Sequence, residues 1–338
     1  MKRKKILITG AAGFIGFSLS KSLLKFGHDV IGIDNINNYY SKNLKFDRIR
    51  ILKKFKNFKF YKIDLRNRKR VKSFFTQNKI EIVYHLAAQA GVRHSIKYPE
   101  DYASNNLLGF FNIMDLSRIF KVNHFIFAST SSVYGLNKKL PFSETDPVNH
   151  PSQFYAATKR SNELMAHSYS CIYGLKCTGV RFFTVYGPWG RPDMALFKFV
   201  KNIIQKKPID VFNNGNHVRD FSYIDDVVEC LKKIKNKYPK KNKSLNSNNP
   251  SISSASYQIL NIGNQSKVKL MDYIKEIEIN LNQKAIKNFL KIQQGDIPNS
   301  YSKIINTNKI IKYKFKTDYK KGIKNFIMWF KEYYRKSN

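Results

Sequence analysis

The sequence predicts an α/β protein with a doubly wound parallel sheet and a smaller C-terminal domain. Two observations predict it. Short apolar runs of strand length alternate with helical patterns over residues 1–180, which is typical of a parallel sheet covered by helices on both faces. After about residue 181 the alternation becomes less regular. We therefore expect one domain over residues 1–180 and a second over residues 181–338, with some elements of the second returning to the first.

The first strand is expected over residues 5–9, and a glycine-rich turn over residues 10–16 follows it at once. A helical pattern over residues 17–26 comes next. Strand, glycine turn and helix in this order form a dinucleotide-binding fingerprint, because glycines let the backbone approach a pyrophosphate and the helix N-terminus presents N–H groups to it. The glycines follow the pattern GxxGxxG and are Gly10, Gly13 and Gly16.

Asp34 follows the expected second strand, residues 30–33. At this position an acidic side chain can bind the 2′-OH of an adenosine ribose. A carboxylate would repel a 2′-phosphate, so the sequence predicts NAD rather than NADP. The alternative is an ordinary loop aspartate, and the preceding glycines argue against it.

The strand and helix rhythm continues through the first half of the chain. Further strands are expected over residues 58–63, 81–88 and 124–128, and helices over residues 71–78 and 107–120. His85 is interpreted as a packed histidine near a strand end. In a parallel sheet of this kind ligands bind at the carboxyl ends of the strands.

A tyrosine and a lysine four residues apart, Tyr155 and Lys159, form a candidate catalytic pair. On a helix they share one face. A nearby ammonium lowers the pKa of a phenol from ~10 toward the range of a general base. The pair alone also fits a solvated helix face. The hydroxyl run over residues 129–132, at the carboxyl end of the fifth strand, favours a proton relay instead.

Three stretches carry a family resemblance: GAAGFIG with Asp34, residues 129–135, and YAATK at residues 155–159. They resemble the extended short-chain dehydrogenase/reductase family, which modifies nucleotide sugars on a Rossmann fold. The resemblance extends over nearly the whole chain. Residues 87–93 and 181–195 look most like the UDP-glucuronate 4-epimerases among its branches.

The resemblance implies a reaction. Tyr155 would take the proton from the sugar O4, Lys159 would lower the pKa of Tyr155 and hold the nicotinamide ribose, and Thr130 would hydrogen-bond the reacting hydroxyl. A hydride would pass from C4 to NAD and return on the other face of a 4-keto sugar. The product would be UDP-galacturonate, a precursor for surface polysaccharide.

The resemblance also implies two sets of binding residues. Residues 1–180 would be the NAD-binding domain, and residues 181–338 would mainly bind the nucleotide sugar. The implied cofactor residues, besides the three glycines, Tyr155 and Lys159, are Phe14, Ile15, Asp34, Asn35, Asp64, Leu65, Leu86, Ala87, Ala88, Gln89, Ala90 and Asn106. The implied substrate residues are Arg93, Ser129, Thr130, Ser131, Ser132, Phe183, Thr184, Arg191, Arg219 and Asp296, with Arg219 on the diphosphate and Asp296 on the uridine ribose.

Ser131 and Ser132 help to separate the branches of the family. The related 4,6-dehydratases carry acids at both positions and the UDP-glucuronate decarboxylases carry Glu at the second. A serine hydroxyl is too weak an acid to replace a carboxyl group in eliminating water near neutral pH. Of the reactions considered, dehydration is therefore disfavoured and epimerisation is expected.

Thr184 and Arg191 are expected to recognise the sugar C6 carboxylate. Thr184 stands where UDP-galactose 4-epimerases have Asn. Alternatively, Arg191 only pairs with Asp193 or with a surface acid. The sugar would then be UDP-glucose or a UDP-N-acetylhexosamine.

The later part of the chain is expected to hold helices and one strand around a loop. The helices are predicted over residues 195–206, 224–235, 271–281 and 323–334, the strand over residues 259–263, and a surface loop rich in Lys, Asn and Ser over residues 237–256.

Composition bounds the remaining possibilities. A formal charge of +38, from 61 Lys and Arg against 23 Asp and Glu, raises the hypothesis of a nucleic-acid-binding protein. The lysines are spread along the whole chain, and the intact Thr130, Tyr155 and Lys159 argue against a non-catalytic protein. We therefore expect no nucleic-acid partner.

We expect no metal site, because the three cysteines lack a CxxC spacing, and we interpret them as free thiols of a reducing compartment. The apolar run after the basic N-terminus is broken by Thr9, Gly10 and Gly13, so it is not read as a signal peptide. No run approaches the length of a membrane span. The expected location is the cytoplasm. Helices over residues 106–120 and 155–173 are candidates for a homodimer interface.

Overall fold

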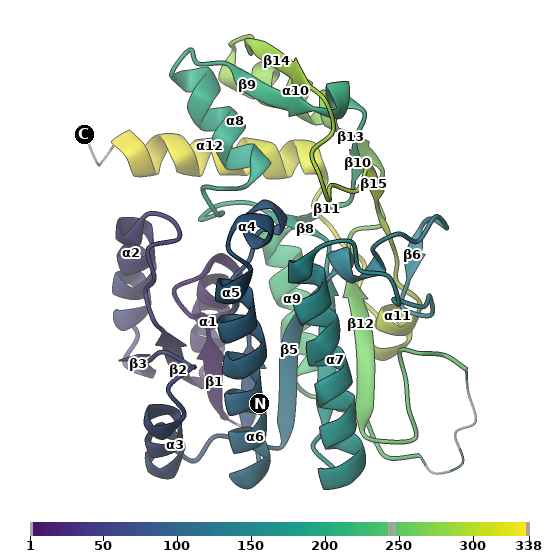
Figure 1. The fold of residues 1–338 in the computed structure, drawn as a ribbon. Coiled ribbons are helices and arrows are strands. Elements are labelled where there is room, and N and C mark those ends of the chain that lie inside the picture. Colours follow the sequence, from purple (N-terminus) through teal and green to yellow (C-terminus); the bar gives the residue numbers. More distant parts are fainter. Residues whose placement is uncertain (1–2, 243, 245–247, 336–338) are drawn as a thin grey trace.

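A seven-stranded parallel sheet forms the centre of the computed structural model, which describes residues 3–242, 244 and 248–335 (Figure 1). The strand order is β12-β7-β5-β4-β1-β2-β3. The strands are β1 (Lys5–Thr9), β2 (Asp29–Asp34), β3 (Phe58–Lys62), β4 (Ile82–His85), β5 (His124–Thr130), β7 (Cys177–Phe182) and β12 (Tyr257–Ile262). This confirms the predicted fold class.

The order of the strands reverses beside β1. The chain runs from β1 outward through β2 to β3 and then returns to place β4 on the other side of β1. Connections therefore leave this point in opposite directions and open a crevice at the carboxyl ends of β1 and β4, where doubly wound folds bind ligands. The last strand, β12, comes from the C-terminal half and pairs with β7.

Two layers of helices cover the sheet, because successive residues of a strand point to opposite faces. Ile6 and Ile8 of β1 belong to the cluster packed under α1 and α9, whereas Leu7 belongs to the cluster under α3, α6 and α7. The helices concerned are α1 (Phe14–Lys25), α3 (Arg68–Gln77), α6 (Gly109–Ile119), α7 (Phe154–Tyr173) and α9 (Ile224–Ile234). The helix α2 (Lys42–Lys53) packs beside α1.

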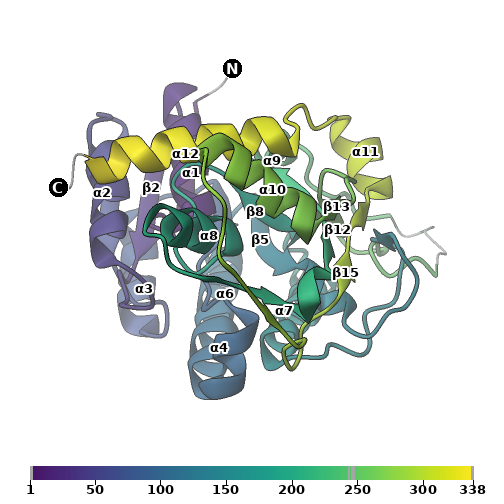
Figure 2. The same ribbon diagram turned by 90° about the horizontal axis from the view of Figure 1, so that it is seen from above.

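A smaller group of elements lies over the carboxyl ends of the strands (Figures 1 and 2). Its helices are α8 (Ala195–Ile204), α10 (Leu270–Leu281) and α12 (Tyr319–Arg335). Its short strands are β8 (Thr184–Tyr186), β9 (Ile209–Phe212), β10 (Val218–Arg219), β11 (Phe221–Tyr223), β13 (Val268–Lys269), β14 (Lys287–Leu290) and β15 (Asn299–Ser300). The short elements at its margin are β6 (Phe142–Ser143), β16 (Ser302–Lys303) and α11 (Ile305–Ile311).

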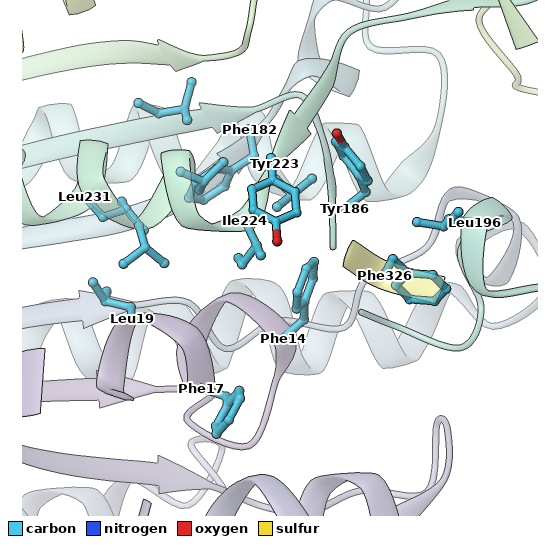
Figure 3. Packing of buried hydrophobic residues seen from close by; sticks show 14 of the residues in the cluster. Phe14, Phe17, Leu19, Phe182, Tyr186, Leu196, Tyr223, Ile224, Leu231 and Phe326 are labelled. Atoms are coloured by element: carbon cyan, nitrogen blue, oxygen red, sulfur yellow. The ribbon is translucent and has the colours of Figure 1, made fainter. Parts of the chain in front are cut away.

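One hydrophobic cluster runs from the sheet into this upper group. Phe14 of α1 lies near Tyr223 of β11 and Ile224 of α9, and Phe17 of α1 and Phe326 of α12 belong to the same cluster (Figure 3). Burying these side chains together stabilises the arrangement by roughly 1.5–3 kcal/mol for each large apolar side chain. The upper group is therefore packed against the sheet layer.

Several predicted boundaries were wrong. The helix expected at 107–120 begins earlier, because α5 (Pro99–Tyr102) continues through a π-helical turn (Ala103–Leu108) into α6. Asn106 therefore lies inside the helix rather than ahead of it. The strand expected to reach residue 88 ends at His85, and α2 and α4 (Val92–Lys97) had not been predicted.

The segment over residues 237–256 connects α9 to β12. Its described residues form no helix or strand, although Ile252 makes an isolated bridge to Gln258. Residues 243 and 245–247 of the predicted loop lie outside the described part of the chain. None of the helices in the described residues has the length and apolar character of a membrane span.

Candidate active site

A cavity of about 880 Å³ opens at the carboxyl ends of the strands, between the sheet and the upper group of elements. The glycine turn after β1, the end of β2, the segment after β4, β5 and α7 form one side, and β8, the loop before α8, Phe212 and Arg219 form the other. Pockets of 300–1,000 Å³ are typical for small-molecule ligands. The cavity is bordered by every predicted site residue except Asp64 and Asn106, which lie behind its wall.

The glycine turn leaves backbone exposed to the cavity. Gly10 has a φ of +72°, and a Cβ there would lie 2.8 Å from the Ala87 nitrogen. A Cβ on Gly16 would lie 2.1 Å from the Gly10 carbonyl oxygen. Only glycine therefore fits either position. Gly13 caps α1 without a side chain, so the N–H groups at the start of α1 are presented to an anion in the cavity.

Asp34 lies at the far end of this half of the cavity. Its carboxylate accepts hydrogen bonds from the backbone N–H of Ala12 at 3.1 Å and of Ile36 at 2.8 Å. Burial raises the pKa of Asp34, whereas these two bonds and the nearby Lys45 and Arg48 lower it. The carboxylate is thus held in place beside the glycine turn.

Some of the residues predicted to bind the adenine or to line the cofactor channel border the cavity, and others lie behind them. Asn35 and Leu65 border the cavity, whereas Asp64 forms a 2.7 Å ion pair with Arg66 behind them. Asn106 accepts the Gln89 N–H at 2.8 Å and donates to the Gln89 carbonyl at 3.0 Å. It therefore holds the backbone that lines the channel.

The residues present fit NAD. The side-chain-free turn leaves room for a pyrophosphate, the fixed Asp34 carboxylate suits a ribose diol, and the Gln89 amide nitrogen is buried without a hydrogen-bond partner among the described residues. Small side chains at Ala87, Ala88 and Ala90 border the channel between them.

Tyr155 and Lys159 lie on α7 and both border the cavity. A hydrogen bond from Thr130 lowers the pKa of the Tyr155 phenol. Thr130 itself ends β5, and its oxygen also accepts the Ser132 N–H at 3.2 Å. The predicted hydroxyl, phenol and ammonium are therefore brought to one wall.

The contacts of Lys159 and Tyr155 differ from those expected of the pair. Burial raises the pKa of Tyr155, and the groups that lower it are Arg191 and Thr130 rather than Lys159. The Lys159 ammonium donates to the Ala128 carbonyl at 2.8 Å, and burial lowers its own pKa to about 8. A strand carbonyl thus holds the ammonium, and the predicted effect of Lys159 on the Tyr155 pKa stays a prediction.

Below the catalytic wall, Glu163 anchors α7 to the sheet. Its carboxylate accepts the Ser129 hydroxyl at 2.6 Å and two bonds from the Arg181 guanidinium at 2.8 and 2.9 Å. Both charged side chains are fully buried. The charge of Glu163 also raises the pKa of Lys159 against the effect of burial.

The residues predicted to contact the sugar, Ser131, Ser132, Phe183, Thr184 and Arg191, all border the cavity. Arg191 forms a two-pronged ion pair with Asp193, with Nε to Oδ1 at 3.0 Å and Nη2 to Oδ2 at 2.5 Å. Tyr39 donates to the same carboxylate at 3.2 Å. Arg191 thus makes the pairing left open by the sequence and also faces the cavity.

A second group of arginines, Arg93 and Arg219, also borders the cavity. Arg219 and Arg93 lie 3.7 and 3.9 Å from the Asp296 carboxylate, and the Arg93 guanidinium stacks 4.5 Å above the Phe212 ring. Burial lowers the pKa of Arg219, as does the neighbouring charge of Arg93, while Asp296 raises it. Two guanidinium groups against one carboxylate leave positive charge for a diphosphate.

Sequence reasoning missed several residues that border the cavity. They come from α2 and the loop before it, from the start of α7, from α8 and from the segment before β15, and they include Asn37, Tyr39, Tyr40, Lys45, Gln153, Lys198 and Gln293. Lys45 donates to the Asn37 side chain at 2.6 Å, and burial lowers its pKa to about 8. Its position one helical turn before Arg48 was the available signal.

Comparison with known proteins identifies the family. Residues 6–248 match the model of the NAD-dependent epimerase/dehydratase family. The chain belongs to the NAD-dependent epimerase/dehydratase family. This confirms the resemblance found in the sequence, and NAD, the predicted cofactor, is the one for which the family is named.

Relatives within the family cover almost the whole chain. Protein CapI of Staphylococcus aureus is 49% identical over 98% of this chain and 100% of its own length. A probable UDP-glucuronate 4-epimerase of Rhizobium meliloti is 40% identical over 99% of both chains. The crystal structure of UDP-glucuronic acid 4-epimerase from Bacillus cereus, in complex with UDP-glucuronic acid and NAD, has a TM-score of 0.86 at 31% identity. It covers 98% of this chain and 100% of that chain.

Proposed function

We propose that the protein catalyses the NAD-dependent 4-epimerisation of UDP-glucuronate to UDP-galacturonate. The observation that carries the proposal is one cavity wall with Thr130, Tyr155 and Lys159, facing Arg191, with serines at positions 131 and 132. The relatives from Rhizobium meliloti and Bacillus cereus support the same substrate.

NAD, when bound, supplies a hydride acceptor and donor for the sugar C4. Tyr155 takes the O4 proton as the hydride leaves C4, and Thr130 hydrogen-bonds the reacting oxygen. The 4-keto sugar then turns over within the cavity. Tyr155 would return the proton to O4 as C4 regains a hydride on its opposite face, so the net reaction inverts C4 and consumes no cofactor.

Ser131 and Ser132 limit the outcome to epimerisation. Both border the cavity beside Thr130, and each carries only a hydroxyl. Loss of water from the sugar needs an acid that gives up its proton near neutral pH, and a serine hydroxyl does not.

The sugar acid is assigned to Arg191 and Thr184. A C6 carboxylate would enter beside a guanidinium whose charge is now balanced by Asp193. That same balance favours a second candidate, a UDP-glucose or UDP-N-acetylhexosamine 4-epimerase, because a neutralised arginine attracts an anion less.

The test is proton NMR of the sugar anomeric and H4 signals during incubation with UDP-glucuronate and NAD. We expect signals of UDP-galacturonate with the natural protein and none with Tyr155→Phe, which keeps the ring and loses the base. If UDP-glucose or its N-acetyl relative is converted and UDP-glucuronate is not, the proposed substrate is wrong and the proposed mechanism still holds.

We also propose a homodimer formed through α6 and α7, which lie side by side in Figure 1. These helices and the turn before α6 carry exposed apolar side chains, namely Leu108, Phe111, Ile119, Phe154, Leu164, Ile172 and Tyr173. Exposed apolar side chains gathered on neighbouring helices are typical of an interface. A second copy would cover them by twofold symmetry.

Light scattering after gel filtration tests the dimer. We expect twice the mass of the 39.5 kDa chain, and a shift toward the monomer with Leu164→Lys. Ile279→Lys is the matched control, because Ile279 is 62% exposed on α10, away from the two helices. A natural protein with the mass of one chain would contradict the proposal.

We place the reaction in the cytoplasm, because Cys171, Cys177 and Cys230 are free thiols in the structure. The absence of a nucleic-acid partner stays a prediction. Binding of RNA that weakens steeply with salt, in a protein without epimerase activity, would contradict it.

A further inference from the structure

The loop that presents Arg191 has an unfavourable backbone. Trp189, two residues before Arg191, has a φ of +65°, a region that bulky side chains rarely adopt. Gly187 has a φ of +135°, and a Cβ on Gly190 would lie 2.9 Å from the Gly187 carbonyl oxygen. Such conformations persist where the surroundings impose them, and they cluster at functional sites.

Arg48 of α2 holds this backbone in place. Its Nη2 donates to the carbonyl oxygens of Trp189 at 2.5 Å and Gly190 at 3.3 Å. Its Nη1 donates to the carbonyl oxygen of Ala12 at 2.8 Å and to the Tyr40 hydroxyl at 2.8 Å. One guanidinium therefore joins the Arg191 loop to the glycine turn of the cofactor half.

The surroundings of Arg48 are unusual for a charged side chain. Arg48 is 0% exposed, and its guanidinium donates to neutral oxygens, while the Asp34 carboxylate lies near enough to feel its charge. Burying a charge against neutral acceptors is costly. A residue kept there at such a cost is a candidate for function.

The Trp189 side chain is fixed from two further directions. Its ring lies 5.3 Å from that of Phe17 on α1 and 5.3 and 5.2 Å from those of Trp329 and Tyr333 on α12. The carbonyl side of Trp189 faces Arg48 and the ring side faces this aromatic cluster. The loop is thus held on both sides immediately before Arg191.

We infer that Arg48 is a positioning residue for Arg191 and thereby controls the acceptance of an acidic sugar. The inference rests on the proposed function, because it concerns the recognition of the sugar carboxylate. The planar fork of Arg48 spans two backbone segments at once. A lysine has a single ammonium point charge and reaches only one of them.

A binding cycle on the NAD-loaded protein tests the inference by calorimetry. Arg48→Lys should weaken UDP-glucuronate binding about tenfold, which corresponds to about 1.4 kcal/mol, and change UDP binding less than about twofold. In an Arg191→Met background the same change should have almost no effect, because the two residues act as one unit. Arg50→Lys is the matched control, since Arg50 lies on the same helix and is exposed.

Two results would overturn the inference. One is an equal loss of UDP and UDP-glucuronate binding in Arg48→Lys, which indicates general damage. The other is an additive loss in the Arg191→Met background. If Arg48→Lys does not fold, Tyr40→Phe removes one partner of Arg48 and should give a smaller effect that also vanishes with Arg191→Met.

A second measurement separates this inference from the proposed function. The chain has two tryptophans, so Trp329→Phe leaves Trp189 as the only fluorophore of its kind. Adding Arg48→Lys should shift Trp189 emission and increase its quenching by acrylamide, whatever sugar the protein uses. Unchanged emission and quenching would refute the positioning of the loop even if UDP-glucuronate is the substrate. If UDP-glucuronate is not converted but Arg48→Lys changes the Trp189 emission, only the proposed substrate is refuted.

Discussion

Replacing Glu163 by Gln should destabilise the protein strongly and leave its shape almost unchanged. The Glu163 carboxylate is fully buried and accepts hydrogen bonds from Ser129, Arg160 and Arg181 at 2.6 to 3.0 Å. Arg181 is likewise fully buried and forms its two-pronged ion pair with this carboxylate. Gln keeps the volume but removes the negative charge.

The expected loss follows from the partner left behind. Arg181 would keep its hydrogen bond to the Tyr134 hydroxyl, which is 3.1 Å long, and one to the amide oxygen of the new Gln, but its charge would be uncompensated. Breaking a buried pair in this way costs about 3–5 kcal/mol. Replacing both partners with apolar residues, Glu163→Leu with Arg181→Met, should recover most of that loss, because neither member of the pair then leaves an unpaired charge.

Urea unfolding followed by circular dichroism measures these free energies of unfolding. Arg50→Gln, which breaks the exposed pair with Asp47, is the control and should change the free energy of unfolding by less than about 0.5 kcal/mol. A loss below about 1 kcal/mol for Glu163→Gln would refute the reasoning. A double variant less stable than Glu163→Gln would refute it equally.

Three further predictions test other parts of the site. Arg191→Met should raise the pKa of Tyr155, because the charge of Arg191 lowers that pKa. The rising limb of the pH profile of kcat/KM should then move to higher pH, and a limb that does not move would contradict this. Gly16→Ala should reduce the NAD retained after gel filtration, whereas Gly109→Ala, with its nearest neighbour at 3.6 Å, should retain it. Burial lowers the pKa of His124 in the folded protein to about 3, whereas His124 in the unfolded chain has a pKa of ~6.5. Between these two pH values the unfolded chain therefore binds more protons than the folded protein. Stability should be full above pH ~6.5 and fall toward pH 3, with a shallower fall for His124→Gln in unfolding curves measured between pH 5 and 6.5.

The sequence predicted those parts of the protein in which local pattern and tertiary role agree. The glycine spacing of residues 10–16 determines a turn by the space it requires, and apolar strands β1, β2 and β5 were found within a few residues. The helix carrying Tyr155 and Lys159 was also predicted, since YAATK and the residues after it suit a helix. In each case nearby residues supply the decisive contacts.

What remained hidden depends on contacts between distant segments. The helix α2 buries Lys45 and Arg48, and its Phe46 is 53% exposed. The apolar residues of this segment therefore do not mark the buried face of the helix, and the helix was not predicted. Only the loop around Trp189, far along the chain, gives Arg48 its acceptors. The continuation of α5 through a π-helical turn had no signal in the spacing of apolar residues.

The electrostatics of the catalytic base show how distance along the chain conceals a function. Spacing assigned the activation of Tyr155 to Lys159, four residues away, whereas in the structure Arg191 lowers the pKa of the phenol. The same guanidinium is assigned to the sugar carboxylate, and Asp193 balances its charge. An arriving carboxylate would compete with Asp193 for Arg191 and add a second negative charge near the phenol. Substrate recognition and the pKa of the base are therefore coupled through one side chain, which is why the position of its loop matters for the reaction.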